Sequence, residues 1–567
     1  MTIGGPSGPD DVGDRRPSVV MDRRAFLGTS LAAAGAVYLG ACRSPGDSPG
    51  EEGRPTLRIP GRDFGFPSPF SYFVGPGYTR MSYIYDSLLW VDASGHLVPW
   101  LATSYQASPD GMTYAFEIRE GVVWHDGRPV TPDDVVFTFE YYAAHERDIA
   151  PFVVVRSRDV AQARATGGRG VEVRLRAPSV PFLKEVAARL PIVPRHIWAP
   201  VSNPGQRREL EVLVGSGPYR LQSYSGGQGS YLYTANDAFF LGRPFVKRLE
   251  LAPVDDELTA VYAGELDAGG SRPVGVTPDA LRPFAEDDSF EVVEGPEDQV
   301  VALYWNLGRG GAMADPRFRQ ACCHAIDRNN MVKRLLGDLG YPGNPGFLPP
   351  RHPFHAQVEQ YAFDPDTANR LLDQAGYQRD ASGGRRTREG RPLRFELLAP
   401  PDVASAVDLV VQALKAIGVE LSINPVDFPT LVNTMGQGGY EMAVIYYGNL
   451  SGDPDFMRTA YSSRVPAKVF LSAQGYVNRQ LDDVADQQRV TADEARRKEL
   501  LSQMQHIAAR DVPLLHLYYP RLFHVFRKAK FDEWAFTPDS GFLSSPYNKE
   551  LFVTGSKAPG ADIRPAE

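Results

Sequence analysis

The chain has 567 residues, with 60 Lys and Arg against 69 Asp and Glu, which gives a formal net charge of -9. This length exceeds the roughly 250 to 300 residues at which a single core stops growing, so we expect two or three domains. Hydrophobic residues make up 43% and charged residues 23%, a composition that excludes a wholly disordered chain. The charge also lacks the basic blocks that a phosphate backbone attracts, so nucleic acid is excluded as an expected partner.

Residues 21–42 have the pattern of an export signal. Arg23 and Arg24 precede an apolar run at 25–39, which is shorter than the about 20 residues needed to span a bilayer. The arginine pair resembles a twin-arginine export motif, and the sequence LGAC ending at Cys42 resembles a lipobox. We therefore predict that Arg23 and Arg24 belong to the export signal and that Cys42 receives a lipid.

Two features of this leader leave alternatives open. Asp22 and Gly28 depart from the usual twin-arginine pattern, so export by the general secretory route is the alternative. Met21 is a second possible start, because a signal normally begins close to its arginines. Residues 43–55 are rich in Ser, Pro, Gly and Glu and are predicted to form a flexible tether between the lipid and the folded body.

The first elements after the tether show both strand and helix patterns. Alternating apolar and polar residues predict a half-buried strand at 114–119, and residues 124–129 have the composition of a turn. Thr131 is followed by Pro132 and, three positions after the threonine, by Asp134, which predicts a capped helix start.

Later segments continue the alternation of helix and strand patterns. Asp-Pro steps predict helices at 316–331 and from 365 onward, and an apolar run predicts a strand at 442–447. Thr491 and Glu494 have the spacing of a capping box before a helix that reaches about residue 509. This order predicts a protein built of α/β layers.

Residues 101–140, LATSYQASPDGMTYAFEIREGVVWHDGRPVTPDDVVFTFE, resemble the signature region of the family 5 solute-binding proteins, which bind dipeptides, oligopeptides or nickel. Further motifs of this family occur in the same order along the chain, and the resemblance covers roughly residues 56–550. They are GSGPY at 215–219, GELD at 264–267, AIDR at 325–328, AGY at 375–377, GYVN at 475–478 and PLL at 513–515.

The resemblance implies an α/β, bilobed, periplasmic-binding-protein-like fold of class II, type C. An extra subdomain is inserted in the first lobe, and a hinge joins the two lobes, which close on a ligand. The predicted parts are a leader at 1–42, the tether at 43–55, a first lobe at 56–80, 215–300 and 516–555, an inserted subdomain at 81–214, a second lobe at 301–515 and a disordered tail at 556–567.

The motifs of common enzyme classes are missing from the sequence. It contains no G-x-x-x-x-G-K-[ST], no H-E-x-x-H and no G-x-G-x-x-G. GDSPG at 46–50 has the letters of a nucleophile elbow but lies in the tether, without a strand before it or a helix after it. His352 and His355 lack neighbouring acidic or cysteine ligands. We therefore expect no enzyme, no cofactor and no metal site.

Candidate ligand contacts follow from position within the resemblance, because pockets use rigid aromatic side chains and a few polar groups. Trp305 lies where the chain enters the second lobe, Tyr447 and Asn449 follow a predicted strand, and Phe66 lies near the start of the first lobe. Asp453 is added as a carboxylate that lies close to the same segment.

Leu450 bears on the kind of ligand. In the dipeptide and oligopeptide binders that the chain resembles, a carboxylate three residues before the acidic residue of an Asp-Pro or Glu-Pro step pairs with the α-ammonium of the peptide. Here that step is Asp453-Pro454, and Leu450 occupies the carboxylate position. A buried ammonium without a partner is costly, so the ligand is predicted to be a modified peptide, a glycan or another polar metabolite. Asp453 or Asp455 is the alternative partner for an ammonium.

The function implied by the resemblance is that of a monomeric substrate-binding lipoprotein of an ABC importer. It would capture a peptide or peptide-like solute outside the cytoplasm and deliver it to a membrane permease driven by a separate ATPase. The alternatives are a ligand-sensing receptor, a binder of an oligosaccharide or other non-peptide solute, and an extracellular hydrolase.

Overall fold

The computed structural model describes residues 53–72, 76–92, 95–145, 159–270, 274–465, 470–537 and 547–555. From Pro55 onward the chain forms one compact unit. Arg23, Arg24 and Cys42, most of the predicted tether and the predicted tail lie outside the described residues.

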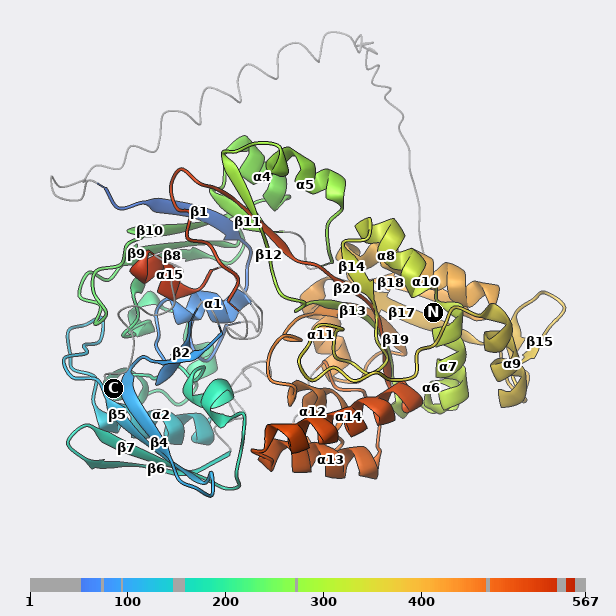
Figure 1. Ribbon diagram of the computed structural model, residues 1–567, viewed down its shortest axis with the longest axis horizontal. Helices are drawn as coiled ribbons and strands as arrows, with labels where there is room; N and C mark the ends of the chain where they lie inside the picture. Colours follow the sequence, from blue (N-terminus) through green and yellow to red (C-terminus); the bar gives the residue numbers. More distant parts are fainter. Residues whose placement is uncertain are drawn as a thin grey trace, which may run out of the picture. The chain divides into compact units, whose positions relative to one another are not determined.

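Two small sheets make up the part of the chain that we call the first lobe (Figure 1). One contains, in spatial order, β1 (Thr56–Gly61), β10 (Arg248–Pro253), β9 (Ser230–Ala235) and β8 (Tyr219–Ser225). The other contains β11 (Ala268–Gly270), β21 (Phe523–Arg527) and β12 (Phe290–Glu294). Strand β1 runs parallel to β10, and the other pairs are antiparallel. The helices of this lobe are α1 (Pro76–Ser82), α4 (Glu257–Ala263), α5 (Pro278–Ala285) and α15 (Lys549–Thr554).

An inserted subdomain follows α1 in the chain. It contains the hairpin of β2 (Leu89–Val91) and β3 (Leu97–Pro99), and an antiparallel sheet of β4 (Ala102–Ala107), β5 (Thr113–Ile118), β7 (Gly170–Leu175) and β6 (Val160–Gly167). Its α-helices are α2 (Pro132–Ala144) and α3 (Arg195–Trp198). Strand β5 confirms the predicted strand. The start of α2 is also confirmed, because Asp134 Oδ2 accepts from the Thr131 N–H at 2.9 Å.

A six-stranded sheet forms the centre of the second lobe. Its order is β14 (Gly340–Pro342), β20 (Leu514–Pro520), β13 (Val300–Trp305), β19 (Met442–Tyr447), β17 (Arg394–Ala399) and β18 (Glu420–Pro425). Strand β19 coincides with the predicted strand. Successive side chains of a strand point to opposite faces. Along β13 the two faces carry Val300, Ala302 and Tyr304 on one side and Val301, Leu303 and Trp305 on the other, in two separate cores.

Helices cover both faces of this six-stranded sheet (Figure 1). One core includes residues of α7 (Pro316–Ala325), α8 (Arg328–Leu336), α9 (Pro365–Ala375) and α10 (Ala404–Ala416). The other includes residues of α11 (Phe428–Gly436), α12 (Phe456–Tyr461), α13 (Arg479–Val490) and α14 (Glu494–Asp511). The central strands β13, β19 and β20 are therefore buried along their whole length and consist mainly of apolar residues, whereas the edge strand β18 is largely exposed.

Two predicted helices differ from those observed. The helix expected at 316–331 is two helices, because the chain is extended at Ile326 and Asp327 then caps α8 by accepting from the Asn330 N–H at 2.9 Å. The predicted capping box is also wrong. The Asp493 carboxylate, and not Thr491, caps α14 by accepting from the Arg496 N–H at 2.7 Å. With Asp493 as the cap, the helix begins at Glu494, two residues later than a cap at Thr491 would place it.

The strand order shows where the chain passes from one sheet to another. The exact limits of the domains stay predictions. It leaves the three-stranded sheet after β12 and enters the six-stranded sheet at β13, and it returns between β20 and β21. Strand β20 extends to Pro520, five residues beyond the predicted end of the second lobe at 515. At this crossing Arg521 Nε donates to Glu294 Oε1 at 2.7 Å.

A buried ion pair joins the last described helix to the segment after α1. Lys549 Nζ lies 2.5 Å from Asp86 Oδ1, and both side chains are fully buried. The ammonium also donates to the carbonyl oxygens of Ser82 and Tyr85, each at 3.0 Å, and lies 4.2 Å from the centroid of the Trp90 ring. All three donor positions of the lysine are thus used inside the core.

Removing this lysine should destabilise the protein strongly. Lys549→Met leaves the Asp86 carboxylate buried without its cation, and breaking a buried pair in this way costs about 3–5 kcal/mol. We expect a lower urea midpoint and a lower free energy of unfolding. Lys528→Met, at an exposed lysine, is the matched control. Equal midpoints for the two variants would show that the pair does not hold α15 in place.

Candidate functional site

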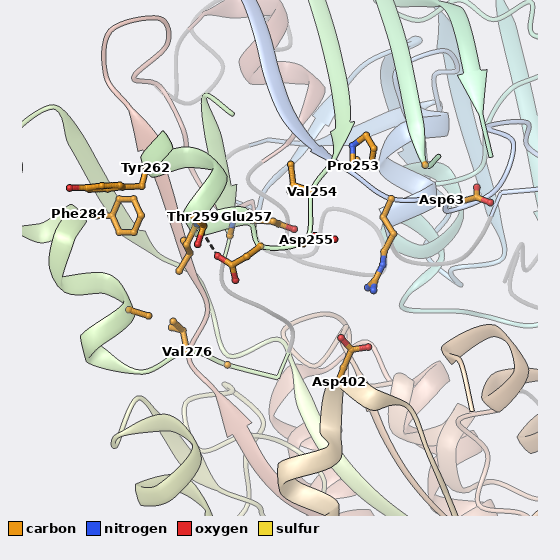
Figure 2. Close-up of a pocket in the computed structure, with 18 of the residues that line it drawn as sticks. Asp63, Pro253, Val254, Asp255, Glu257, Thr259, Tyr262, Val276, Phe284 and Asp402 are labelled. Atoms are coloured by element: carbon orange, nitrogen blue, oxygen red, sulfur yellow. Dashed lines mark hydrogen bonds between the residues drawn. The ribbon is translucent and has the colours of Figure 1, made fainter. Parts of the chain in front are cut away.

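The described residues enclose a pocket of about 1050 Å³ between loops of the first lobe and two residues of the second lobe (Figure 2). The segments after β1 and β10, the turn between β8 and β9, α4 and α5 supply the first-lobe wall, and Leu335 and Asp402 face it. Pockets of this volume accommodate small solutes. It is lined by Gly61, Arg62, Asp63, Gly226, Gly227, Gln228, Gly229, Pro253, Val254, Asp255, Asp256, Glu257, Leu258, Thr259, Tyr262, Gly270, Gly275, Val276, Thr277, Ala280, Pro283, Phe284, Leu335 and Asp402.

Acidic residues dominate the charge of this lining. In Figure 2, Asp255 and Glu257 lie on the first-lobe wall, and Asp402 projects toward the same space from the opposite side. Arg62 is the single basic residue among the described residues that line the pocket, against five acidic ones. A pocket with this balance attracts cations and repels anions.

The acidic residues differ in what they bind within the protein. The Asp63 carboxylate accepts from the Tyr224 hydroxyl at 2.6 Å, and Asp256 caps α4 by accepting from the Thr259 N–H at 2.8 Å. Glu257, the first residue of α4, accepts from the Gly270 N–H at 2.7 Å through Oε2. Burial raises the pKa of Glu257 to about 7, and Arg80 and Arg62 offset this only in part.

Arg62 and Asp402 also meet at the phenol of Tyr446, at the end of β19. Burial and the Asp402 carboxylate raise the pKa of Tyr446 to about 12, and the positive charge of Arg62 opposes this shift. A basic residue of the first lobe and an acidic residue of the second lobe therefore act on the same phenol beside the pocket.

The other end of the pocket is aromatic. Tyr262, on α4, is 57% exposed, and its ring centroid lies 5.8 Å from that of Phe284 in an edge arrangement. Phe290 lies behind both rings, 5.2 Å from Phe284 and 6.1 Å from Tyr262. An exposed tyrosine supported by two phenylalanines provides a rigid apolar surface with one polar tip.

None of the five residues predicted to contact the ligand lines this pocket, so the structure does not bring them together there. Trp305 is fully buried in the core between the six-stranded sheet and helices α7 to α10. Phe66 is buried in the first-lobe core, with its ring centroid 5.8 Å from that of Tyr224. Their role as ligand contacts stays a prediction. Both side chains are buried in this conformation and would have to become accessible to a ligand.

Tyr447 and Asn449 lie at the end of β19 and are mostly buried. The Tyr447 hydroxyl lies 2.7 Å from His516 Nε2, and His516 Nδ1 lies 2.8 Å from the Tyr519 hydroxyl. Burial lowers the pKa of His516 to about 3, which keeps this imidazole neutral between the two phenols. Asn449 has a φ of 75°, a left-handed conformation that asparagine tolerates better than most residues.

Asp453 is held by an arginine of the protein itself. Arg497 donates to both of its carboxylate oxygens, at 2.5 and 3.0 Å, so the preferred bidentate partner of this carboxylate is already present. Leu450 is buried, and its N–H donates to the Asp298 carbonyl oxygen at 3.2 Å. A ligand ammonium therefore finds no unpaired carboxylate at either position.

The sequence interpretation missed Arg62, Asp255, Glu257 and Asp402. They follow the carboxyl ends of β1, β10 and β17, where ligands collect in sheets with parallel strands. The run Asp255-Asp256-Glu257 directly after a strand was the available signal.

Two absences apply to the residues that the structure describes. No group of three or more His, Cys, Asp or Glu side chains is arranged to hold a metal ion in that part of the chain. None of the helices found there has the length and hydropathy of a membrane span.

In sequence, the chain is similar to extracellular solute-binding and peptide-binding proteins. The profile of the bacterial extracellular solute-binding proteins, family 5 Middle, matches residues 96–468. The oligopeptide-binding protein AppA of Bacillus subtilis is 26% identical over 448 residues, which cover 77% of this chain and 81% of AppA. The dipeptide-binding protein of Escherichia coli is 23% identical over 473 residues, which cover 80% of this chain and 85% of that protein.

Solved structures show the same fold. NikZ from Campylobacter jejuni, in complex with Ni(L-His), has a TM-score of 0.75 at 22% identity, and the match covers 88% of this chain and 99% of NikZ. The AppA structure, in complex with a nonapeptide, has a TM-score of 0.74 at 20% identity and covers 87% of this chain and 98% of AppA. The predicted bilobed α/β fold is confirmed.

The raised pKa of Glu257 predicts a dependence of stability on pH. Because the folded protein favours the protonated acid, the stability that Glu257 contributes is complete below pH 4.5 and is lost as the pH rises through about 7. Glu257→Gln stays neutral and keeps the acceptor for Gly270. We expect the variant to gain about 1–3 kcal/mol relative to the original protein between pH 5 and pH 8.

Urea unfolding at the two pH values measures this gain. Glu286→Gln, at an exposed glutamate of the same lobe, is the control and should follow the unaltered protein at both pH values. Parallel pH profiles for Glu257→Gln and the unaltered protein would contradict the burial of this carboxyl group.

Proposed function

Because the chain belongs to the bacterial extracellular solute-binding proteins, family 5, we propose that it captures a peptide or peptide-like solute and delivers it to an ABC permease driven by a separate ATPase. Members of this family are extracytoplasmic transport binding proteins, not enzymes. The observation that carries the proposal is the family match over residues 96–468, together with a solute-sized pocket that residues of both lobes line. Closure of the lobes on the solute would present one defined surface to the permease.

The names of two relatives favour a peptide as the solute, and the name of a third favours a different solute. AppA is named as an oligopeptide binder and the Escherichia coli relative as a dipeptide binder, whereas NikZ carries Ni(L-His). In this chain Leu450 and the Arg497-bound Asp453 leave no carboxylate for a free α-ammonium at the position that the resemblance implies. A modified peptide, a glycan or another polar metabolite is therefore the solute that we propose.

A ligand-sensing receptor is the second function. Such a protein would use the same closure but present its ligand to a membrane signalling protein. A permease and an ATPase encoded beside this chain favour transport, and a sensor kinase there favours signalling.

Unmodified peptides should bind weakly at best. Calorimetry against di- to pentapeptides and against oligosaccharides tests this, because an unpaired buried ammonium opposes binding by several kcal/mol, about 100-fold or more in affinity. We expect N-acetylated peptides or a non-peptide solute to bind more tightly than free peptides. Micromolar binding of free peptides that is abolished by N-acetylation would overturn the proposed solute class. Mass spectrometry of the ligand released from denatured protein identifies the solute directly.

We also propose that Cys42 is the lipid anchor and that Arg23 and Arg24 direct export by the twin-arginine route. The apolar run supports this proposal, because it ends in LGAC and is short for a permanent span. Cys42→Ala should abolish labelling by a radioactive fatty acid and move the protein from the membrane fraction to the soluble fraction.

The export route has its own test. Changing both Arg23 and Arg24 to lysine should block export if the twin-arginine route is used, and unchanged export would assign the protein to the general secretory route. An unlabelled wild-type protein in the soluble fraction would exclude the lipid anchor.

A further inference from the structure

Gly270 forms an open niche in the first-lobe wall of the pocket. It is the last residue of β11, it pairs with His524 on β21, and its N–H donates to Glu257 Oε2 at 2.7 Å. A methyl group built on Gly270 would lie 3.6 Å from the Phe523 carbonyl oxygen, 3.7 Å from Glu257 Oε2 and 3.8 Å from His524 Nδ1, which are ordinary contact distances. The missing side chain therefore leaves space for a small group between a carboxylate and an imidazole.

His524 is a buried polar side chain with an unused hydrogen-bonding capacity. It is 1% exposed, and among the described residues neither ring nitrogen has a hydrogen-bond partner. The rings of Trp534 and Tyr547 lie 5.2 Å from its ring, centroid to centroid, and that of Phe536 lies 6.1 Å away. Aromatic rings thus occupy much of its surroundings, and Nδ1 faces the niche. Leaving such a group unsatisfied costs about 1–3 kcal/mol.

The state of His524 limits what it can bind. Burial lowers its pKa to about 3, so the imidazole is neutral at physiological pH. A neutral imidazole has one nitrogen that accepts a hydrogen bond. With that nitrogen directed to the niche, His524 offers an acceptor and no charge.

Glu257 provides the charge on the other side of the niche. The described part of the chain contains no ion pair with this carboxylate, and Gly270 is the one donor found for it there. An ionised carboxylate accepts about four hydrogen bonds, so most of its capacity faces the niche and the pocket. A cation placed beside it would remove the unfavourable burial of the negative charge.

The residues around the niche also favour a cation. Asp255 and Asp402 line the pocket, and the exposed Tyr262 belongs to its aromatic end. Carboxylates and aromatic rings both attract cations, whereas a phosphate or carboxylate ligand would be repelled. A metal ion is a poorer fit, because two protein ligands fall short of the three or more that zinc sites use.

We propose that the niche at Gly270 binds a cationic nitrogen group of the solute, a primary ammonium or a guanidinium, which donates N–H bonds to the Glu257 carboxylate and to His524. This inference rests on the proposed function, since it assigns the charge of the solute that the pocket captures. It places recognition of the positive charge on the first lobe, far along the chain from Leu450.

Two substitutions isolate the niche. Gly270→Ala fills the space at contact distances that the fold accommodates, and it leaves every charge in place. Glu257→Gln removes the charge and keeps an acceptor for the Gly270 N–H. The controls are Gly436→Ala, where a methyl group meets nothing within 4 Å, and Glu286→Gln at an exposed glutamate.

The probe is a pair of pentapeptides, Ala-Ala-Lys-Ala-Ala and Ala-Ala-norleucine-Ala-Ala, both N-acetylated and C-amidated, so that the lysine ammonium is the single cation. Calorimetry with the full chain should show at least tenfold tighter binding of the lysine peptide. Glu257→Gln and Gly270→Ala should reduce this preference to less than threefold, and both controls should keep it. Putrescine and agmatine serve as non-peptide cations in the same assay.

The outcomes separate this inference from the proposed function. Equal affinity for the two peptides would overturn the niche and leave peptide capture standing. Binding of putrescine or agmatine alone, lost in Glu257→Gln, would support the niche and overturn the peptide as solute. A preference for lysine that survives both niche substitutions would overturn the assignment to Gly270. Failure of all four probes to bind would overturn the niche as a cation site and leave the capture of a glycan or another polar solute standing.

Discussion

The two segments by which the chain passes between the two sheets lie side by side, and this constraint determines how the protein is assembled. The chain passes from the three-stranded sheet to the six-stranded sheet once after β12 and returns once before β21. On one side of these crossings β12 pairs directly with β21, and on the other side β13 pairs directly with β20. Arg521 and Glu294 join the two crossings by a hydrogen bond. Because both crossings lie together, each lobe is assembled from distant parts of the chain, and the pocket takes its walls from residues separated by more than 300 positions.

The sequence predicted helices and strands correctly where it offered one candidate cap or one pattern of apolar residues. The alternation at β5 and the Asp134 contact at Thr131 involve residues a few positions apart, so the sequence alone contains the information. At α14 both Thr491 and Asp493 are suitable caps, and the energies of such caps differ by less than the contribution of tertiary packing. The break at Ile326 has the same origin, because Asp327 offers a second cap within a continuous helical pattern.

The candidate site was harder to predict than the fold. The family resemblance identified the architecture but directed attention to the second lobe, where Trp305 proved to face a core. Successive residues of β13 face two different cores, and no local feature of the sequence shows that helices cover both faces of this sheet. In the acidic segment at 255–257, Glu257 contacts Gly270, and only the assembled three-stranded sheet places Gly270 beside His524.

The ion pair of Lys549 with Asp86 has a consequence for the order of events during synthesis. The first lobe begins at β1, but the Asp86 carboxylate in its core has its cation on α15, 463 residues later. The six-stranded sheet needs no strand beyond Pro520. On the ribosome, the first lobe therefore begins to be synthesised first but is completed last. The second lobe is able to fold before α15 is made, and only then does Asp86 obtain its cation.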